Sequence, residues 1–198
     1  MSVVISAKYK DGIAIIADKQ VTCGTTKSNN GNKLQYFKYS NSAIGVVGYL
    51  RDCNIIRTIE EILPYKDILD KVLINDLYVI RTIIPVIYQS LQQNKRITMT
   101  NGIESMDSVM LYCTKDKMFE IGQDFSVLEI DDYYYAIGCG DDKASGFLSS
   151  VGDTSNLTKE EITKILQEAV KKGCEKDVYI NDYTDCLLYT SDAADEGL

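Results

Sequence analysis

Short runs of β-branched and aromatic residues alternate along this chain with longer segments of helical hydrophobic spacing. Such runs, bounded by polar turn residues, predict strands. The predicted strands are residues 3–9, 13–17, 34–39, 43–47, 108–114, 118–121, 127–130, 133–137 and 178–183. Lys10-Asp11-Gly12 between the first two predicts a hairpin, whereas residues 22–32, rich in Thr, Ser, Asn and Gly, predict a loop.

Hydrophobic residues three and four positions apart predict two helices in the first half of the chain. The first covers residues 55–63, and Pro64 is expected to end it. The second covers residues 77–91 and is expected to bend at Pro85. The predicted buried face of this second helix consists of Leu77, Ile80, Ile84, Ile87 and Leu91.

Two more helices are predicted in the second half. One begins near Asp141, and the other covers residues 158–172, where Thr158 and Glu161 have the spacing of a capping box. Strands, paired helices, strands and paired helices in this order predict one α+β domain over residues 1–185, with two sheets and the helices outside them.

The last segment, residues 186–198, is expected not to be native. Its sequence, CLLYTSDAADEGL, resembles the translation of a transposase-type sequencing adapter. The alternative is a genuine frayed tail.

Composition narrows the chemistry that the chain can perform. The 198 residues include 21 Lys and Arg against 29 Asp and Glu, a formal net charge of −8, and no histidine. The missing histidine excludes Ser-His-Asp and Cys-His triads and His-ligated zinc. An acidic balance without a basic cluster argues against nucleic acid as a partner.

Two further absences concern location and metal chemistry. No apolar run approaches the roughly 18 residues of a membrane span, and the first residues lack a signal-peptide pattern, so we expect a cytoplasmic protein without membrane contact. None of the six cysteines forms a Cys-x-x-Cys pair, so no metal site or cofactor is expected.

The first 24 residues carry the most specific pattern. Ser2 is followed by the predicted hairpin, then by Asp18 sixteen residues later, and then by Thr22-Cys23-Gly24. This arrangement resembles the start of proteasome β-subunits and HslV-type peptidases, which are N-terminal nucleophile (Ntn) hydrolases. In that family a nucleophile at the mature N-terminus precedes a hairpin, an Asp and a Thr-x-Gly loop.

Four later segments resemble the same family in the same order. Asn32-Lys33-Leu34 is similar to the segment that holds the catalytic lysine, and the turn at Gly48 resembles the one that supplies the oxyanion-hole amide. Gly138-Cys139-Gly140 is similar to the Gly-Ser-Gly turn, with Cys139 in place of serine. Residues 176–180 resemble Arg-Asp-x-x-Ser, which places Asp177 on the family's aspartate. The resemblance covers about residues 2–184.

The resemblance implies a four-layer αββα sandwich and a peptidase mechanism. Removal of Met1 would leave Ser2 with both the nucleophilic hydroxyl and the base, because a free α-amine has a pKa of about 7.7–8.0, near operating pH. Lys33 paired with Asp18 would stabilise developing negative charge, and the Gly48 amide would bind the oxyanion. The resemblance also places Cys139 and Asp177 at catalytic positions, although Cys139 and Ile180 lack two hydroxyls that usually hydrogen-bond the amine.

The family also suggests substrates and partners. Val21, Val46 and Leu50 correspond to positions that line the first specificity pocket, which would be apolar. The substrate would be a peptide or unfolded protein, the assembly a homo-oligomeric ring, and an ATPase unfoldase a further partner. Two alternatives stay open: a catalytically inactive ring subunit, and an Ntn amidase acting on a small amide.

Overall fold

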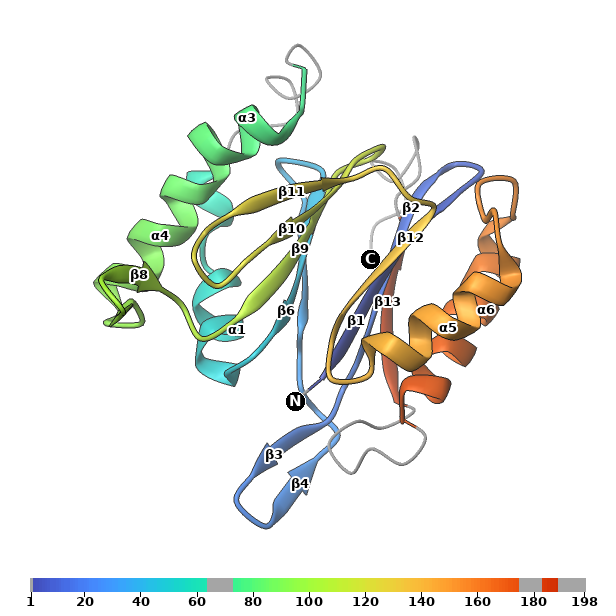
Figure 1. Ribbon diagram of the computed structural model, residues 1–198, viewed down its shortest axis with the longest axis horizontal. Coiled ribbons are helices and arrows are strands. Elements are labelled where there is room, and N and C mark those ends of the chain that lie inside the picture. The colour runs from blue at the N-terminus through green and yellow to red at the C-terminus, as the bar shows by residue number, and fades with distance from the viewer. Residues whose placement is uncertain (1, 64–72, 175–182, 189–198) are drawn as a thin grey trace.

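Two antiparallel sheets lie face to face in the computed structural model, which describes residues 2–63, 73–174 and 183–188 (Figure 1). The strand order is β12-β1-β2-β13 in the first sheet and β11-β10-β9-β6-β5 in the second. The strands of the first sheet are β1 (Val3–Tyr9), β2 (Gly12–Asp18), β12 (Tyr134–Gly138) and β13 (Thr184–Leu188). Those of the second are β5 (Leu34–Phe37), β6 (Ser42–Val47), β9 (Val109–Cys113), β10 (Met118–Ile121) and β11 (Val127–Ile130).

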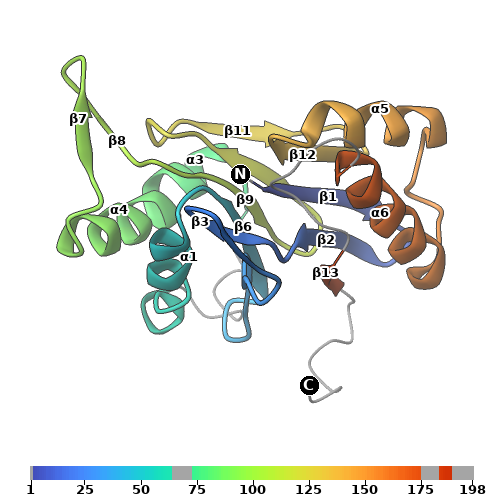
Figure 2. The same cartoon turned by 90° about the horizontal axis from the view of Figure 1, so that it is seen from below.

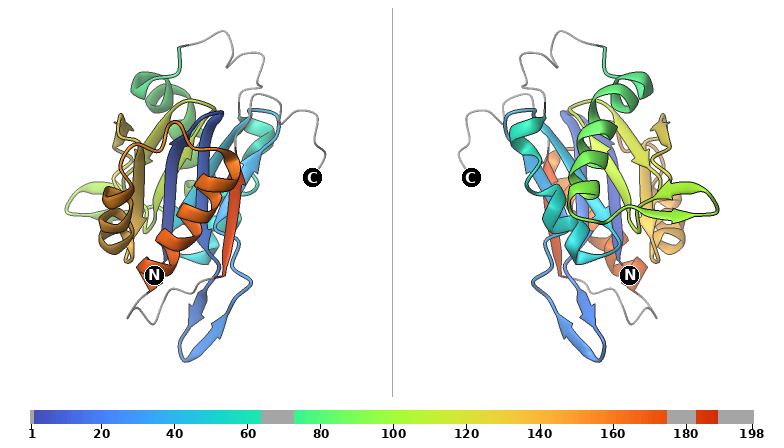
Figure 3. Two further views of the ribbon diagram at one scale, coloured as in Figure 1. Left: turned by 90° about the vertical axis from the view of Figure 1, so that its right-hand side faces the viewer. Right: turned by 90° about the vertical axis from the view of Figure 1, so that its left-hand side faces the viewer.

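Helices cover the outer face of each sheet. α5 (Asp141–Val151) and α6 (Lys159–Cys174) lie on the first sheet, and α1 (Leu50–Ile56) and α4 (Ile84–Gln93) lie on the second (Figure 1, Figure 3). The predicted four-layer αββα arrangement is therefore confirmed.

β1 lies in the middle of these layers and is buried on both faces. Val3 and Ile5 pack against the helix layer, whereas Val4 packs against the second sheet. β1 and β2 form the predicted hairpin, with Tyr9 opposite Gly12. A strand covered on both faces needs a nearly continuous apolar run, which explains the sequence Val-Val-Ile at its start.

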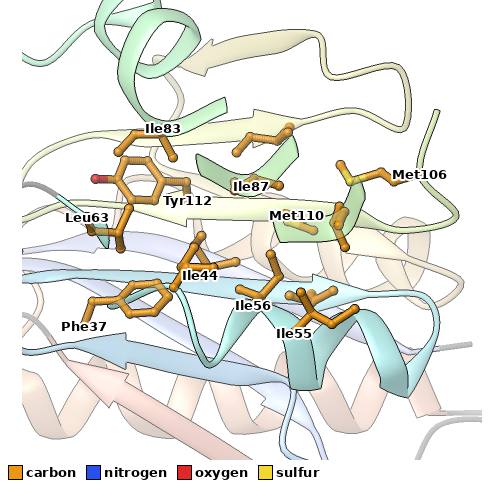
Figure 4. Packing of buried hydrophobic residues seen from close by; sticks show 14 of the residues in the cluster. Phe37, Ile44, Ile55, Ile56, Leu63, Ile83, Ile87, Met106, Met110 and Tyr112 are labelled. Carbon is orange, nitrogen blue, oxygen red and sulfur yellow. The ribbon is translucent and has the colours of Figure 1, made fainter. Parts of the chain in front are cut away.

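The second sheet and its helices enclose another core cluster (Figure 4). Tyr112 on β9 lies close to Phe119 on β10, with ring centroids 6.1 Å apart. Ile56 from α1 and Ile87 from α4 pack onto the same cluster. This packing fixes α1, and with it the β6–α1 turn, relative to the sheets.

The capping box at the start of α6 is confirmed. The Thr158 backbone N–H donates to Glu161 Oε2 at 2.9 Å, and the Glu161 N–H donates to Thr158 Oγ1 at 3.4 Å. The helix buries Ile162, Leu166, Ala169 and Val170 against the first sheet, as its spacing predicts.

The helix predicted over residues 55–63 is wrong in its bounds. α1 begins at Leu50 and ends at Ile56, and a separate 3-10 turn covers Glu60–Ile62. Pro64, expected to end that helix, lies outside the described residues. The helix starts earlier because the turn at Gly48 is followed directly by the N-cap residue Tyr49 and then by α1.

The segment predicted as residues 77–91 contains a π-helical turn. α3 (Asp76–Tyr78), the π turn η2 (Val79–Ile83) and α4 follow one another without a break. Pro85 has no N–H and its ring disfavours the carbonyl four residues earlier, so the turn before it widens. The predicted face is wrong at its start, where Leu77 and Ile80 are 51% and 44% exposed. The buried residues are instead Val79, Ile83, Ile87 and Leu91.

Two exposed β-ribbons were not predicted. β3 (Val21–Cys23) and β4 (Thr26–Ser28) form one within the expected loop, and it projects beyond the sheets (Figure 1). β7 (Thr98–Thr100) and β8 (Ile103–Ser105) form the other, which extends beyond α4 (Figure 2). Asn101-Gly102 joins the latter pair with positive φ at both residues, a hairpin signal that the sequence did contain.

The last described strand differs from the predicted one. β13 covers Thr184–Leu188 and pairs with β2, with Cys186 opposite Ile16. Residues 178–182 of the predicted strand lie outside the described residues. β13 includes three residues of the tail expected to be non-native, and the origin of that tail stays a prediction. No helix in the described ranges is long and apolar enough to span a membrane.

Candidate active site

Ser2 lies immediately before β1 and is only 3% exposed. Its carbonyl oxygen accepts a hydrogen bond from the Cys139 backbone N–H at 2.9 Å, and the Cys139 Sγ lies 3.5 Å from the same oxygen. Gly138 makes this approach achievable: its φ is +109°, and a Cβ there would lie 2.1 Å from the Ser2 carbonyl oxygen. The turn after β12 thus holds Ser2 by its backbone.

Asp18, at the end of β2, connects the start of β1 to Lys33. The hairpin register places Val4 opposite Ala17, so Asp18 comes beside Val3. Asp18 Oδ1 accepts hydrogen bonds from the Val3 N–H at 2.9 Å and from Lys33 Nζ at 2.7 Å. The lysine predicted to assist Ser2 therefore shares one carboxylate oxygen with the amide that directly follows Ser2.

The Lys33–Asp18 ion pair is almost completely removed from solvent. The two side chains are 5% and 0% exposed. Burial lowers the pKa of the Lys33 ammonium, while the charge and hydrogen bond of Asp18 oppose that shift. A shielded positive charge of this kind interacts strongly with any negative charge that develops near Ser2.

Gly48 forms the turn between β6 and α1. Its φ of +147° lies in the region that favours glycine, and a Cβ there would be 2.2 Å from Ser108 Oγ and 2.8 Å from Ser108 Cα. The backbone of Gly48 is therefore in direct contact with the residue that precedes β9. This end of the sheets is also where the N-terminus lies (Figure 1).

Sequence reasoning missed a buried polar cluster behind Gly48. Asp52 is fully buried, and its carboxylate accepts from Arg96 Nε at 2.5 Å, from Arg96 Nη2 at 3.2 Å and from Ser108 Oγ at 2.7 Å. Arg96 Nη2 also donates to Asp107 Oδ2 at 3.1 Å. Asp52 lies four residues after the recognised glycine, but nothing in the sequence links it to Arg96.

The remaining predicted site residues are less closely connected. Val46 is 2% exposed and belongs to the core cluster of the second sheet, Leu50 is 42% exposed at the start of α1, and Val21 is half-buried at the start of β3. Their role in a specificity pocket stays a prediction. Cys139 lies against Ser2 as described above, and Asp177 lies outside the described residues.

The described part of the chain contains no group of three Cys, Asp or Glu side chains that could hold a metal ion.

Comparison with solved structures identifies the fold. A eukaryotic HslV from Trypanosoma brucei matches with a TM-score of 0.67 and 18% identity, over 93% of this chain and 97% of that chain. BPH from Thiobacillus denitrificans matches with a TM-score of 0.69 and 16% identity, over 96% and 99%. The fold is that of the proteasome-like Ntn hydrolases.

A BPH structure in complex with Epoxomicin shares this Ntn-hydrolase fold, with a TM-score of 0.66 and 16% identity over 96% of this chain and 99% of that chain. No family model and no curated protein matches the sequence. At these identities the likeness establishes the architecture, and the activity is a separate question.

Proposed function

We propose that this protein is an N-terminal-nucleophile peptidase in which Ser2, once Met1 is removed, provides both the nucleophile and the general base. The observation that supports the proposal is the shared Asp18 Oδ1, which binds both Lys33 Nζ and the amide of Val3, the residue that follows Ser2. The Ntn-hydrolase fold and the lack of any histidine base support the same mechanism.

In the proposed reaction, Ser2 Oγ attacks the carbonyl carbon of the scissile peptide bond and its proton moves to the Ser2 α-amine. The Gly48 amide binds the oxyanion, a contribution of about 3 kcal/mol in other hydrolases. The protonated amine then protonates the leaving nitrogen, which gives an ester on Ser2. Water activated by the same amine hydrolyses that ester and restores the enzyme. Lys33 stabilises the negative charge that develops at Ser2 Oγ.

The proposal includes assembly and substrate. The substrate is a peptide or unfolded protein, and the protein acts as a homo-oligomeric ring with an ATPase unfoldase as a further partner. Support for these points comes from the family resemblance and from the fold shared with HslV. Light scattering at micromolar concentration tests the ring, and a monomer measured on a chain with its natural C-terminus would contradict it.

The direct test measures both the removal of Met1 and the requirement for the Ser2 hydroxyl. Intact mass shows whether Met1 is removed, and the processed protein should hydrolyse a pool of fluorogenic peptides. Ser2→Ala should abolish hydrolysis while the unfolding midpoint stays close to the parent value. Epoxomicin, present in one BPH structure, should inhibit the parent.

Each contrary result has a distinct meaning. Hydrolysis that survives Ser2→Ala would reject Ser2 as the nucleophile. A processed protein with no activity on any peptide would favour the inactive ring subunit, and activity on small amides alone would favour the amidase.

A further inference from the structure

The buried cluster behind Gly48 joins three segments that are distant in sequence. Asp52 lies on α1, Arg96 follows α4, and Ser108 precedes β9. Four hydrogen bonds connect them and Asp107, and all are 3.2 Å or shorter. Breaking one partner of such a buried charge network is costly, because the remaining charge loses its compensation.

Arg96 reaches this cluster from a defined backbone turn. The Arg96 N–H donates to the Leu91 carbonyl and the Lys95 N–H donates to the Gln92 carbonyl, both at 2.9 Å, while Lys95 has a φ of +56°. These are the two bonds of a Schellman motif at the end of α4. The direction in which Arg96 leaves the helix is therefore set by the backbone.

The cluster contacts the Gly48 turn at two points. Ser108 Oγ, which donates to Asp52, lies so close to Gly48 that no Cβ fits between them. The Arg96 guanidinium also lies 5.0 Å from the ring centroid of Tyr49, the residue after Gly48. The turn is thus contacted by the cluster at two successive residues, Gly48 through Ser108 and Tyr49 through Arg96.

We propose that Asp52, Arg96 and Ser108 are positioning residues that hold the Gly48 amide where it can bind the oxyanion. This inference rests on the proposed peptidase function, because it concerns the same reaction. Oxyanion stabilisation depends on a donor fixed before the reaction, so a looser turn should slow the chemical step more than it weakens substrate binding.

The test compares two buried hydroxyls. Ser108→Ala removes the hydrogen bond to Asp52 but keeps the Cβ beside Gly48. Thr154→Val is the matched control: Thr154 is fully buried and its hydroxyl donates to the Lys8 carbonyl at 2.6 Å. Lys8 lies six residues along β1 from Ser2, about 20 Å at the usual rise of a strand. Arg96→Met and Arg96→Lys complete the set.

With an active parent, Ser108→Ala and Arg96→Met should each lower kcat about tenfold or more. KM should stay within twofold, and the acid limb of the pH profile should not move, since the amine base is unchanged. Arg96→Lys should recover part of the loss because it keeps one charged donor, and Thr154→Val should keep kcat within twofold. Values of kcat within twofold of the parent in both Ser108→Ala and Arg96→Met would overturn the proposal.

Hydrogen exchange measured by mass spectrometry separates this inference from the activity. Peptides covering residues 47–56 should exchange faster in Ser108→Ala than in the parent, and Thr154→Val should leave them unchanged. If the parent lacks activity but this difference appears, the peptidase function fails while the anchoring of the turn holds. Equal exchange in Ser108→Ala and the parent would overturn the positioning role, including when Arg96→Met fails to fold.

Discussion

Lys33 and Lys19 provide a direct comparison between a buried and an exposed ion pair in one chain. Lys33 Nζ lies 2.7 Å from Asp18 with both side chains nearly inaccessible, whereas Lys19 Nζ lies 2.8 Å from Asp185 with side chains 32% and 37% exposed. The two distances differ by only 0.1 Å, but the two ion pairs should contribute unequally to stability, because solvent screens the exposed pair.

We predict that Lys33→Met destabilises the protein by about 3–5 kcal/mol and removes activity, since it leaves the Asp18 carboxylate buried without its charge partner. Lys19→Met should cost about 1 kcal/mol or less and leave kcat nearly unchanged. Urea unfolding and peptide hydrolysis measure both. Similar losses of stability in the two variants would contradict this assignment of the buried pair.

Ser2 has one methyl group fewer than threonine, and we predict that Ser2→Thr retains or raises kcat. A β-branched side chain has fewer χ1 rotamers, so the hydroxyl spends more time in the reactive orientation. Steady-state kinetics on processed protein tests this. A large loss of kcat in a folded, processed Ser2→Thr variant would indicate that the 3% exposed site has no room for the methyl group.

At the scale of elements, two glycines can be compared: one at the end of β12 and one after α5. An alanine at either position would strain the backbone, but only the first would also clash with a neighbouring residue. Gly138 and Gly152 both have positive φ, +109° and +80°. A Cβ at Gly138 would meet the Ser2 carbonyl oxygen at 2.1 Å, while no described atom lies within 4 Å of a Cβ at Gly152.

Gly138→Ala should therefore displace Ser2 and reduce activity by at least tenfold, with a stability loss greater than that of the control. Gly152→Ala should cost about 1–3 kcal/mol from its backbone conformation alone, since its φ of +80° and ψ of −136° are unfavourable for a residue with a Cβ, and should leave kcat unchanged. Kinetics and thermal unfolding compare the two. Equal activity in both variants would show that contact with the turn does not hold Ser2 in place.

The elements that the sequence predicted correctly are those whose signals are local. The β1–β2 hairpin and the capping box of α6 depend on residues a few positions apart, and both were recognised. The π turn before Pro85 changed which residues of its helix are buried, an effect that simple helical periodicity cannot anticipate.

The residues of the candidate site also differ in whether the sequence could predict them. Ser2, Asp18, Lys33 and Gly48 were predicted from the spacing of a family pattern. The structure joins Asp18 to Lys33 and to the amide after Ser2, and the catalytic roles stay a prediction. The Asp52–Arg96 pair was missed because its partners are 44 residues apart and meet only through the packing of α1 and α4.

At the scale of the whole molecule, buried thiols contribute to the response of stability to alkaline pH. Burial raises the pKa of Cys53 to about 11 and that of Cys113 to about 12, from 9.0 for an exposed thiol. The unfolded chain therefore loses these protons at lower pH than the folded chain does. The contribution of these two buried thiols to the free energy of unfolding is fully present below pH 9 and decreases as pH rises towards 11–12. The lowered pKa of Lys33 acts in the opposite direction but is a single group.

We predict that the urea midpoint under reducing conditions decreases between pH 8.5 and 10.5, and that it changes less between pH 6 and 7, where no histidine titrates. Cys53→Ala should reduce the alkaline decrease, because it removes one of the raised pKa values. An identical alkaline slope in Cys53→Ala and the parent would assign the decrease to other groups.

The contacts that fix Ser2 run through its carbonyl oxygen and through the amide of Val3, both on the C-terminal side of its side chain. Cleavage of the bond before Ser2 breaks neither contact. Under the proposed mechanism, the unprocessed chain is therefore a latent zymogen in which these two contacts to Ser2 and Val3 are already formed. Activation would then require cleavage of one peptide bond, so the timing of methionine removal would set when the protein begins to hydrolyse peptides.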